Sequence, residues 1–219
     1  MRKWVSMVVM MAFVLCFAPA AWANSSATGV SADKALQLLT DGNSRFVAEQ
    51  QKASNIGQAR RTELTKGQHP FAIIVSCSDS RVPPELVFDQ GLGDLFVIRT
   101  AGEVVDDVAL GSIEYAVEHV GVHLIVVLGH EDCGAVKAAV AGGEVPGHIG
   151  AITKAIEPAV LQAANQSGDK VSNTVKANVD LIVKKLMMTK PIISEGVSHD
   201  SVKIAGAVYD LKTGKVIFR

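Results

Sequence analysis

Metal-competent side chains follow two apolar stretches of the sequence. Cys77 ends the apolar run 71–77, and His130 and Cys133, spaced His-x-x-Cys, follow the run 124–128. Such runs are typical of buried strands in parallel sheets, which bind ligands beyond their carboxyl ends. Two thiolates and an imidazole are good zinc ligands, and three protein ligands leave a fourth coordination position for water or substrate. The three residues therefore predict a zinc site, provided that the two strand ends meet.

A carboxylate and a guanidinium come directly after the first of these cysteines. Asp79 and Arg81 are two residues apart, so in an extended segment they point the same way and can pair. Arg81 would then hold Asp79 ionised and oriented. Asp79 could accept a hydrogen bond from a metal-bound hydroxide, or it could occupy the fourth ligand position and close the site. A purely structural salt bridge is the alternative interpretation of the pair.

The two cysteines have a second interpretation. In an exported protein, Cys77 and Cys133 could form one structural disulfide. We favour metal ligation because each cysteine lies beside other metal-competent side chains. A dithiol oxidoreductase is disfavoured, because that chemistry expects Cys-x-x-Cys and these two cysteines are far apart in the sequence.

The N-terminus has the three parts of a secretory signal peptide. Arg2 and Lys3 form a short basic region, residues 5–17 form an apolar core, and residues 21–23 read Ala-Trp-Ala, a small-x-small cleavage site. Cleavage at this site would leave residues 24–219 as a single domain of ordinary size. We therefore expect a periplasmic protein.

Two other interpretations of the N-terminus are weaker. A lipoprotein signal would use Cys16, but the bulky Leu15 before it argues against this. An uncleaved membrane anchor is disfavoured because the apolar core is short for a membrane span. After cleavage we expect no membrane association. The remaining chain is mildly acidic and has no basic stripe, which argues against nucleic acid as a partner.

Strands alternate with helices along the chain, which predicts an α/β fold with a mainly parallel central β-sheet flanked by helices. A helical arm is expected at the N-terminus and an antiparallel edge strand at the C-terminus. Pro158 is expected to kink or split the helix that contains it. The expected strands are residues 71–77, 95–99, 124–128, 202–209 and 215–218, and the expected helices are residues 31–51, 60–66, 83–88, 106–118, 133–141, 149–164 and 171–188.

Cys77-Ser-Asp79-Ser-Arg81 together with Gly129-His130-x-x-Cys133-Gly134 resembles the β-class carbonic anhydrases. The similarity covers nearly all of the chain after the signal peptide. Further matching motifs are Gly67-Gln68-x-Pro70-Phe71, Gly93-Asp94-Leu95-Phe96-Val97, Ile113-Glu114-Tyr115-Ala116 and Gly206-Ala207-x-Tyr209-Asp210.

The resemblance implies a zinc enzyme that interconverts carbon dioxide and bicarbonate through a zinc-bound hydroxide. It implies that Cys77, His130 and Cys133 bind the zinc and that Asp79 and Arg81 form a catalytic dyad. It also implies a homodimer, or a higher oligomer built from dimers, with active sites at the subunit interface.

Four further positions are implied to bind substrate: Gln68, Phe96, Tyr115 and Gly134, partly from the partner subunit. Gln68 and Tyr115 resemble the subtype with an open, water-bearing zinc. The proton shuttle is not specified; the candidates by residue type are His69, His119, His123 and His148.

Two residues depart from the family pattern. The usual Arg-Asn-Ala-Gly-Asn segment has Thr100 and Glu103 at its two asparagine positions, so hydrogen bonding in this loop is expected to differ. Two alternative functions remain: a hydrolase of carbon disulfide or carbonyl sulfide on the same scaffold, and an exported zinc-binding protein without catalytic activity.

Overall fold

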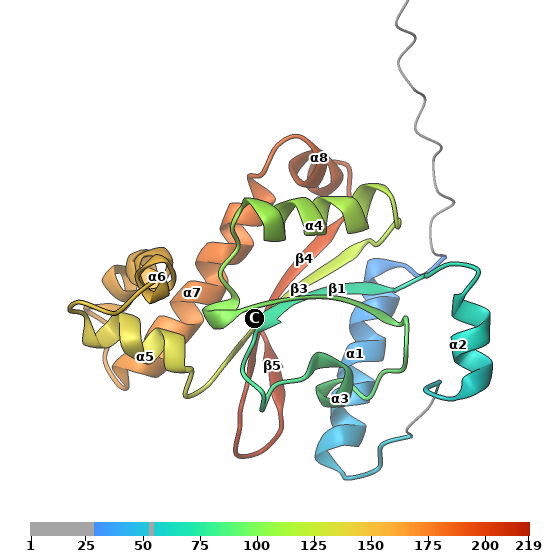
Figure 1. The fold of residues 1–219 in the computed structure, drawn as a ribbon, viewed down its shortest axis with the longest axis horizontal. Helices are drawn as coiled ribbons and strands as arrows, with labels where there is room; N and C mark the ends of the chain where they lie inside the picture. Colours follow the sequence, from blue (N-terminus) through green and yellow to red (C-terminus); the bar gives the residue numbers. More distant parts are fainter. Residues whose placement is uncertain (1–28, 53–54) are drawn as a thin grey trace, which may run out of the picture.

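Five strands form one sheet in the order β2-β1-β3-β4-β5 (Figure 1). The computed structural model describes residues 29–52 and 55–219, and the predicted signal peptide lies outside them. Neighbouring strands are parallel except β5, which is antiparallel to β4 at the C-terminal edge. The predicted α/β fold is therefore confirmed. The strands are β1 (Ala72–Cys77), β2 (Leu95–Thr100), β3 (Leu124–His130), β4 (Lys203–Tyr209) and β5 (Val216–Phe218).

The helices lie on both faces of this sheet, with α5, α6 and α7 grouped at the left of Figure 1 and α1, α2 and α3 at the right. A 3-10 turn, η1 (Ala101–Glu103), follows β2 directly. The helices of the described residues are α1 (Ala32–Val47), α2 (Gln58–Leu64), α3 (Pro84–Val87), α4 (Asp107–Glu118), α5 (Gly134–Ala141), α6 (Ile149–Ala163), α7 (Lys170–Met187) and α8 (Ile192–Ser198).

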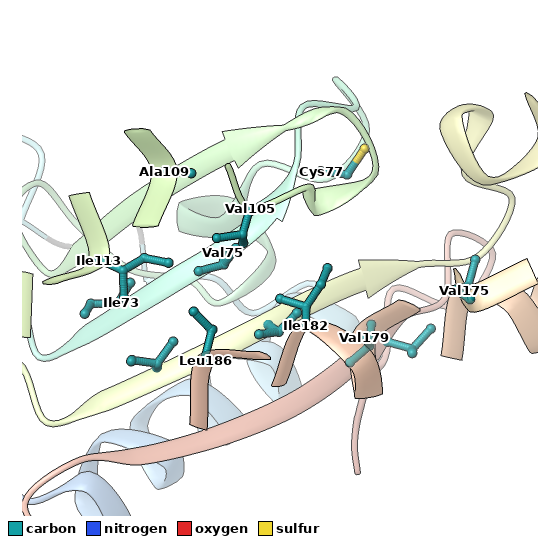
Figure 2. Close-up of a cluster of buried hydrophobic side chains, with 14 of the residues drawn as sticks. Ile73, Val75, Cys77, Val105, Ala109, Ile113, Val175, Val179, Ile182 and Leu186 are labelled. Atoms are coloured by element: carbon teal, nitrogen blue, oxygen red, sulfur yellow. The ribbon is translucent and has the colours of Figure 1, made fainter. Parts of the chain in front are cut away.

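β1 and β3 are buried on both faces, as their apolar sequences predict. On one face, Ile73 and Val75 belong to a core that also contains residues of α4 and α7; Figure 2 shows part of it, with Cys77 at its edge. On the other face, Ile74 belongs to a second core with Leu39 of α1. Sequestering both faces leaves the strand ends as the places where polar chemistry can be presented.

The carboxyl ends of β1, β2 and β3 lie at the same edge of the sheet. Cys77 pairs with Thr100 of β2, and Ser76 pairs with Leu128 of β3. β3 runs two residues further than its predicted end and includes His130, which pairs with Tyr209. This register brings the ends of the two apolar runs together.

Three element predictions need correction. α1 ends at Val47 rather than near residue 51, because Glu49 adopts a left-handed conformation (φ 57°) that stops the helix. α6 continues through Pro158 as one helix, so of the two expected effects of this proline the split is wrong. The segment after residue 190, to which no structure was assigned, forms α8. None of the helices in the described residues combines the length and apolar character needed to span a membrane.

Candidate metal centre

Three side chains from separate elements converge at the carboxyl edge of the sheet. Cys77 ends β1, His130 ends β3, and Cys133 is the residue directly before α5. All three are buried, and one ligand atom from each lies within 4.8 Å of the other two. The cysteines are free thiols with sulfurs 3.9 Å apart, so the structural disulfide is not formed. The prediction that the two strand ends meet is confirmed.

The imidazole of His130 fits a metal ligand. Its Nδ1 lies 2.9 Å from the carbonyl oxygen of Glu131, whereas its Nε2 is buried without a hydrogen-bond partner. A buried polar atom of this kind costs free energy unless something binds it. Metal-ligating histidines commonly donate their other ring N–H to a carbonyl, as Nδ1 can here. The residues present therefore fit a metal ion held by Nε2 and the two sulfurs.

A hydrogen bond joins the two thiols. The hydrogen bond with Cys133 lowers the pKa of Cys77, and the same contact raises the pKa of Cys133. Two thiols this close cannot both ionise without a compensating positive charge. A divalent cation supplies that charge and needs both sulfurs deprotonated, so its binding would release the proton of this hydrogen bond.

Asp79 and Arg81 form a bidentate ion pair beside this centre. Asp79 Oδ1 accepts from Arg81 Nε at 2.9 Å, and Asp79 Oδ2 accepts from Arg81 Nη2 at 2.7 Å. The backbone N–H of Arg81 also donates to Oδ1 at 2.9 Å. These bonds hold the pKa of Asp79 well below its ordinary value. The carboxylate lies close to the centre, with Oδ2 3.8 Å from His130 Nε2.

Arg99 supports the backbone that carries Cys77 and Asp79. Its Nε donates to the carbonyl oxygen of Cys77 at 2.9 Å, and its Nη2 donates to the carbonyl oxygen of Asp79. No role for Arg99 was predicted from the sequence. The signal that could have found it is the register of β1 and β2, which pairs Arg99 with Ser76.

The two departures from the family pattern both hold the η1 turn. Thr100 Oγ1 donates to the carbonyl oxygen of Val104 at 2.6 Å, across the turn. Glu103 is buried, and its Oε1 accepts from Asn178 of α7 at 2.9 Å. Burial raises the pKa of Glu103 to about 7. The expected change in loop hydrogen bonding therefore takes the form of two contacts made by the substituted side chains.

The predicted substrate-binding residues separate into two groups. Gly134 follows Cys133 at the start of α5, where a Cβ would meet nothing within 4 Å. Phe96 pairs with Ile73, four residues before Cys77, which is about 13 Å along the strand. Tyr115 lies against Phe96, with ring centroids 6.5 Å apart.

Gln68 is exposed and precedes β1, so it lies toward the opposite end of the sheet from Cys77. Gln68, Phe96 and Tyr115 are therefore not brought to the metal centre of their own chain.

Three of the candidate proton shuttles, His69, His119 and His123, come before β1 or β3 in the chain and lie toward the opposite end of the sheet from the ligands. His123 precedes β3, whose far end is His130, and its Nδ1 lies 2.8 Å from the carbonyl oxygen of Ser201. The ring of His119 lies against the ring of Tyr115, with centroids 5.1 Å apart and planes tilted by 52°. His148 and His69 are exposed.

An open cavity of about 630 Å³ reaches the edge of the centre. Arg81 lines it, as do Glu131 and Asp132 from the loop between the histidine and the second cysteine. Asp132 is paired with Lys137 and lies 3.8 Å from Arg81 Nη1. The cavity gives solvent a route to the catalytic pair that the sequence predicted.

Comparison with known proteins identifies relatives over most of this chain. The sequence profile of the family described as Carbonic anhydrase matches residues 72–216. A carbonic anhydrase of Mycolicibacterium smegmatis is 44% identical over 189 residues, which cover 84% of this chain and 92% of the relative.

Solved structures agree with this assignment. A tetrameric β-carbonic anhydrase of Sordaria macrospora is 28% identical, with a TM-score of 0.67, covering 72% of this chain and 84% of that one. The β-carbonic anhydrase CcaA is 27% identical, with a TM-score of 0.68, covering 84% of this chain and 94% of that one. With the fold and the Cys-His-Cys group described above, these relationships show that the chain belongs to the β class of the carbonic anhydrase family.

Proposed function

We propose that this enzyme catalyses the reversible hydration of carbon dioxide to bicarbonate and a proton, with zinc as its cofactor. The observation that carries the proposal is the convergence of Cys77, His130 and Cys133, with an unpartnered Nε2, beside the Asp79–Arg81 pair. Two sulfurs and one imidazole nitrogen are a donor set that zinc prefers. The curated relatives carry the name carbonic anhydrase, which supports the same reaction.

Zinc held by these three residues would lower the pKa of water enough to provide a nucleophile near neutral pH. Asp79 stays ionised because Arg81 donates to both of its oxygens, so it can accept a hydrogen bond from the reacting water and orient it. Arg99 fixes the backbone carbonyls on either side of this carboxylate segment. The Gly134 position, without a side chain, leaves room beside Cys133 for substrate.

We propose further that Asp79 is not a zinc ligand in the resting enzyme, which is the open-site form. Both carboxylate oxygens are engaged by Arg81, and the backbone N–H of Arg81 adds a third bond. Rotating Asp79 onto a metal would sacrifice these charge-assisted bonds. The bidentate pair therefore favours a fourth position that is free for water.

We propose that the functional unit is at least a homodimer. Gln68, Phe96 and Tyr115 lie away from the centre of their own chain, so they can line a substrate pocket only if a second copy brings them there. The Sordaria macrospora relatives are described as tetrameric, which supports assembly in this family.

We also propose export to the periplasm, with cleavage after Ala23 leaving residues 24–219 as one domain. The basic start, the apolar core and the Ala-Trp-Ala site support this. The intact mass of protein isolated from the periplasmic fraction would test it: a mass beginning at Asn24 is expected, and an unprocessed Met1 start would contradict it.

The central test combines metal analysis with a carbon dioxide hydration assay on the mature protein. We expect one zinc per chain and hydration activity. Carbon disulfide and carbonyl sulfide should be assayed in parallel, because hydrolysis of these alone would assign the scaffold to another reaction. One zinc per chain with no turnover of any of the three would leave a zinc-binding protein and overturn the proposal.

The variant Asp79→Ala tests the role of the dyad. It should keep the zinc and lose most of the hydration activity, because the reacting water loses its hydrogen-bond acceptor. Asp132→Asn is the matched control, since it removes another carboxylate near Arg81 that lies on the exposed side. Loss of zinc from Asp79→Ala would instead mean that Asp79 is a ligand at rest.

A further inference from the structure

The η1 turn beside the metal centre has an unusual backbone. Gly102 (φ 67°) and Glu103 (φ 45°) are consecutive residues in the left-handed region. A left-handed conformation is unfavourable for a residue with a side chain such as glutamate, because Cβ crowds the backbone. Such a conformation persists only where its surroundings enforce it. Some other part of the molecule must therefore hold this turn.

Asn178 of α7 holds the two left-handed residues of this turn. Its side-chain Nδ2 donates to the carbonyl oxygen of Gly102 at 3.0 Å and to Oε1 of Glu103 at 2.9 Å. Asn178 is 3% exposed and Glu103 is 1% exposed, so water does not compete for these bonds. One amide group thus fixes both left-handed residues of the turn.

The turn delivers a hydrogen bond to a proposed metal ligand. The backbone N–H of Gly102 donates to Cys77 Sγ at 3.3 Å. Gly102 has no room for a side chain here, because a Cβ on it would lie 2.7 Å from Ile156 and 3.1 Å from Ala135. Hydrogen bonds to a metal-bound sulfur withdraw electron density from it and tune the metal.

The carboxyl group of Glu103 also packs against β3, the strand that carries His130. A Cβ on Gly129 would lie 3.2 Å from Glu103 Oε1, and Gly129 directly precedes His130. Glu103 therefore occupies the space between α7 and the ends of the two strands that supply ligands. Its second oxygen, Oε2, is buried without a hydrogen-bond partner, so the group is retained despite the cost of burying it.

We propose that Asn178 and Glu103 are positioning residues for the metal centre. Together they hold the η1 turn so that the Gly102 N–H reaches the Cys77 sulfur, which sets how strongly that sulfur donates to the metal. The inference rests on the proposed function only in taking Cys77 as a ligand. It assigns a role to α7, an element that supplies no ligand itself.

The test uses the mature protein with Co²⁺ in place of zinc, because the thiolate-to-cobalt charge-transfer band reports on the sulfur directly. Asn178→Leu removes both hydrogen bonds and keeps the branched shape of the side chain. Without the Gly102 hydrogen bond the sulfur lone pairs rise in energy, so the band should shift to longer wavelength. Affinity for Co²⁺, measured by competition with a chromogenic chelator, should fall about tenfold or more, because the turn no longer holds the Cys77 sulfur in position for the metal.

Thr174→Val is the matched control on the same helix. Thr174 is also buried, but its hydroxyl donates to the carbonyl oxygen of Lys170 within α7 and not to the turn. It should lose some stability while its cobalt band stays at the wild-type wavelength. This separates a general weakening of α7 from an effect on the sulfur.

A second variant covers the case in which Asn178→Leu fails to fold. The double variant Glu103→Met with Asn178→Leu replaces the side-chain pair by apolar groups, so that only the Gly102 carbonyl oxygen loses its partner. This is less costly than also leaving the Glu103 carboxyl group unpaired. It should fold and show the same band shift.

A band and an affinity equal to those of wild type in either folded variant would overturn the proposal. The failure of the metal centre itself would look different, because wild-type protein would then show no thiolate-to-cobalt band.

Discussion

The sulfurs of Cys77 and Cys133 are 3.9 Å apart, which suits a shared metal ion and also permits oxidation. We predict that protein stripped of metal by a chelator loses both thiols to a disulfide under mild oxidant, whereas metal-loaded protein retains them. The reason is that a bound metal occupies the sulfur lone pairs, which the thiolates need in order to react with an oxidant. Thiol titration of the denatured protein, before and after oxidant, measures this.

Cys133→Ser provides the control for that experiment. With a single thiol left in the mature chain, Cys77 cannot form the internal disulfide, so the metal-free variant should keep its thiol under the same mild treatment. Equal rates of thiol loss in metal-free and metal-loaded wild type would contradict ligation by these sulfurs.

We predict that Glu103 makes the free energy of unfolding depend on pH. Burial raises its pKa from 4.5 to about 7, so between these values the folded chain binds more protons than the unfolded chain. Stability then falls as pH rises through this range. Glu103→Gln keeps the acceptor for Asn178 and removes the charge. Its gain in unfolding free energy over wild type should grow with pH, to about 3 kcal/mol at most.

Urea unfolding of wild type and Glu103→Gln at about pH 5 and about pH 8 checks this prediction. The two proteins should differ least at the lower pH. A difference that stays constant across the range would mean that Glu103 titrates at its ordinary value in the fold.

At the scale of elements, Asn43 joins three segments distant in sequence. Its Nδ2 donates to the carbonyl oxygens of Val87 and Gly214, and its Oδ1 accepts from the backbone N–H of Val216. We predict that Asn43→Leu costs about 2–4 kcal/mol of unfolding free energy, because it leaves buried backbone groups unpaired.

Ser44→Ala is the control, because that exposed hydroxyl bonds only within α1 and its loss should change stability by less than about 0.5 kcal/mol. Chemical denaturation of both variants measures the difference. Equal stabilities would mean that the hydrogen bonds of Asn43 do not stabilise the fold.

Local signals explain which elements the sequence could predict. Ser31 and Asp106 begin α1 and α4 with side chains that cap the helix within three residues, so both starts are readable from neighbouring positions. The early end of α1 is not readable in this way. It depends on a left-handed Glu49, whose following segment is tied to Asp89 far along the chain.

The same distinction applies to the site. Cys77, His130 and Cys133 follow apolar strands, and parallel strands present their carboxyl ends at one edge, so their convergence could be predicted. Arg99 and Asn178 could not be assigned, because their partners depend on strand register and on how α7 packs. The sequence marked Glu103 as a departure, but its contact with Asn178 joins residues 75 apart.

At the scale of the whole molecule, one chain does not complete the predicted substrate pocket. Tyr115 of α4 is 50% exposed. Val108 lies two turns earlier on the same face of this helix and is 79% exposed. α4 contacts β2, which is the edge strand of the sheet. Exposed apolar side chains beside an edge strand are typical of an association surface.

We predict that Val108→Glu weakens self-association and lowers kcat/KM for carbon dioxide hydration while leaving the zinc content at one per chain. A charge on this face opposes burial against a partner, and dissociation would separate Tyr115 from the metal centre that it is proposed to serve. The sedimentation coefficient and the hydration rate of Val108→Glu should both be lower than those of wild type when they are measured over the same protein concentrations. Leu161 lies on α6 and is 69% exposed, so Leu161→Glu places the same charge on another surface. This control should leave self-association and kcat/KM unchanged. Full activity in monomeric Val108→Glu would show that a single chain completes its own pocket.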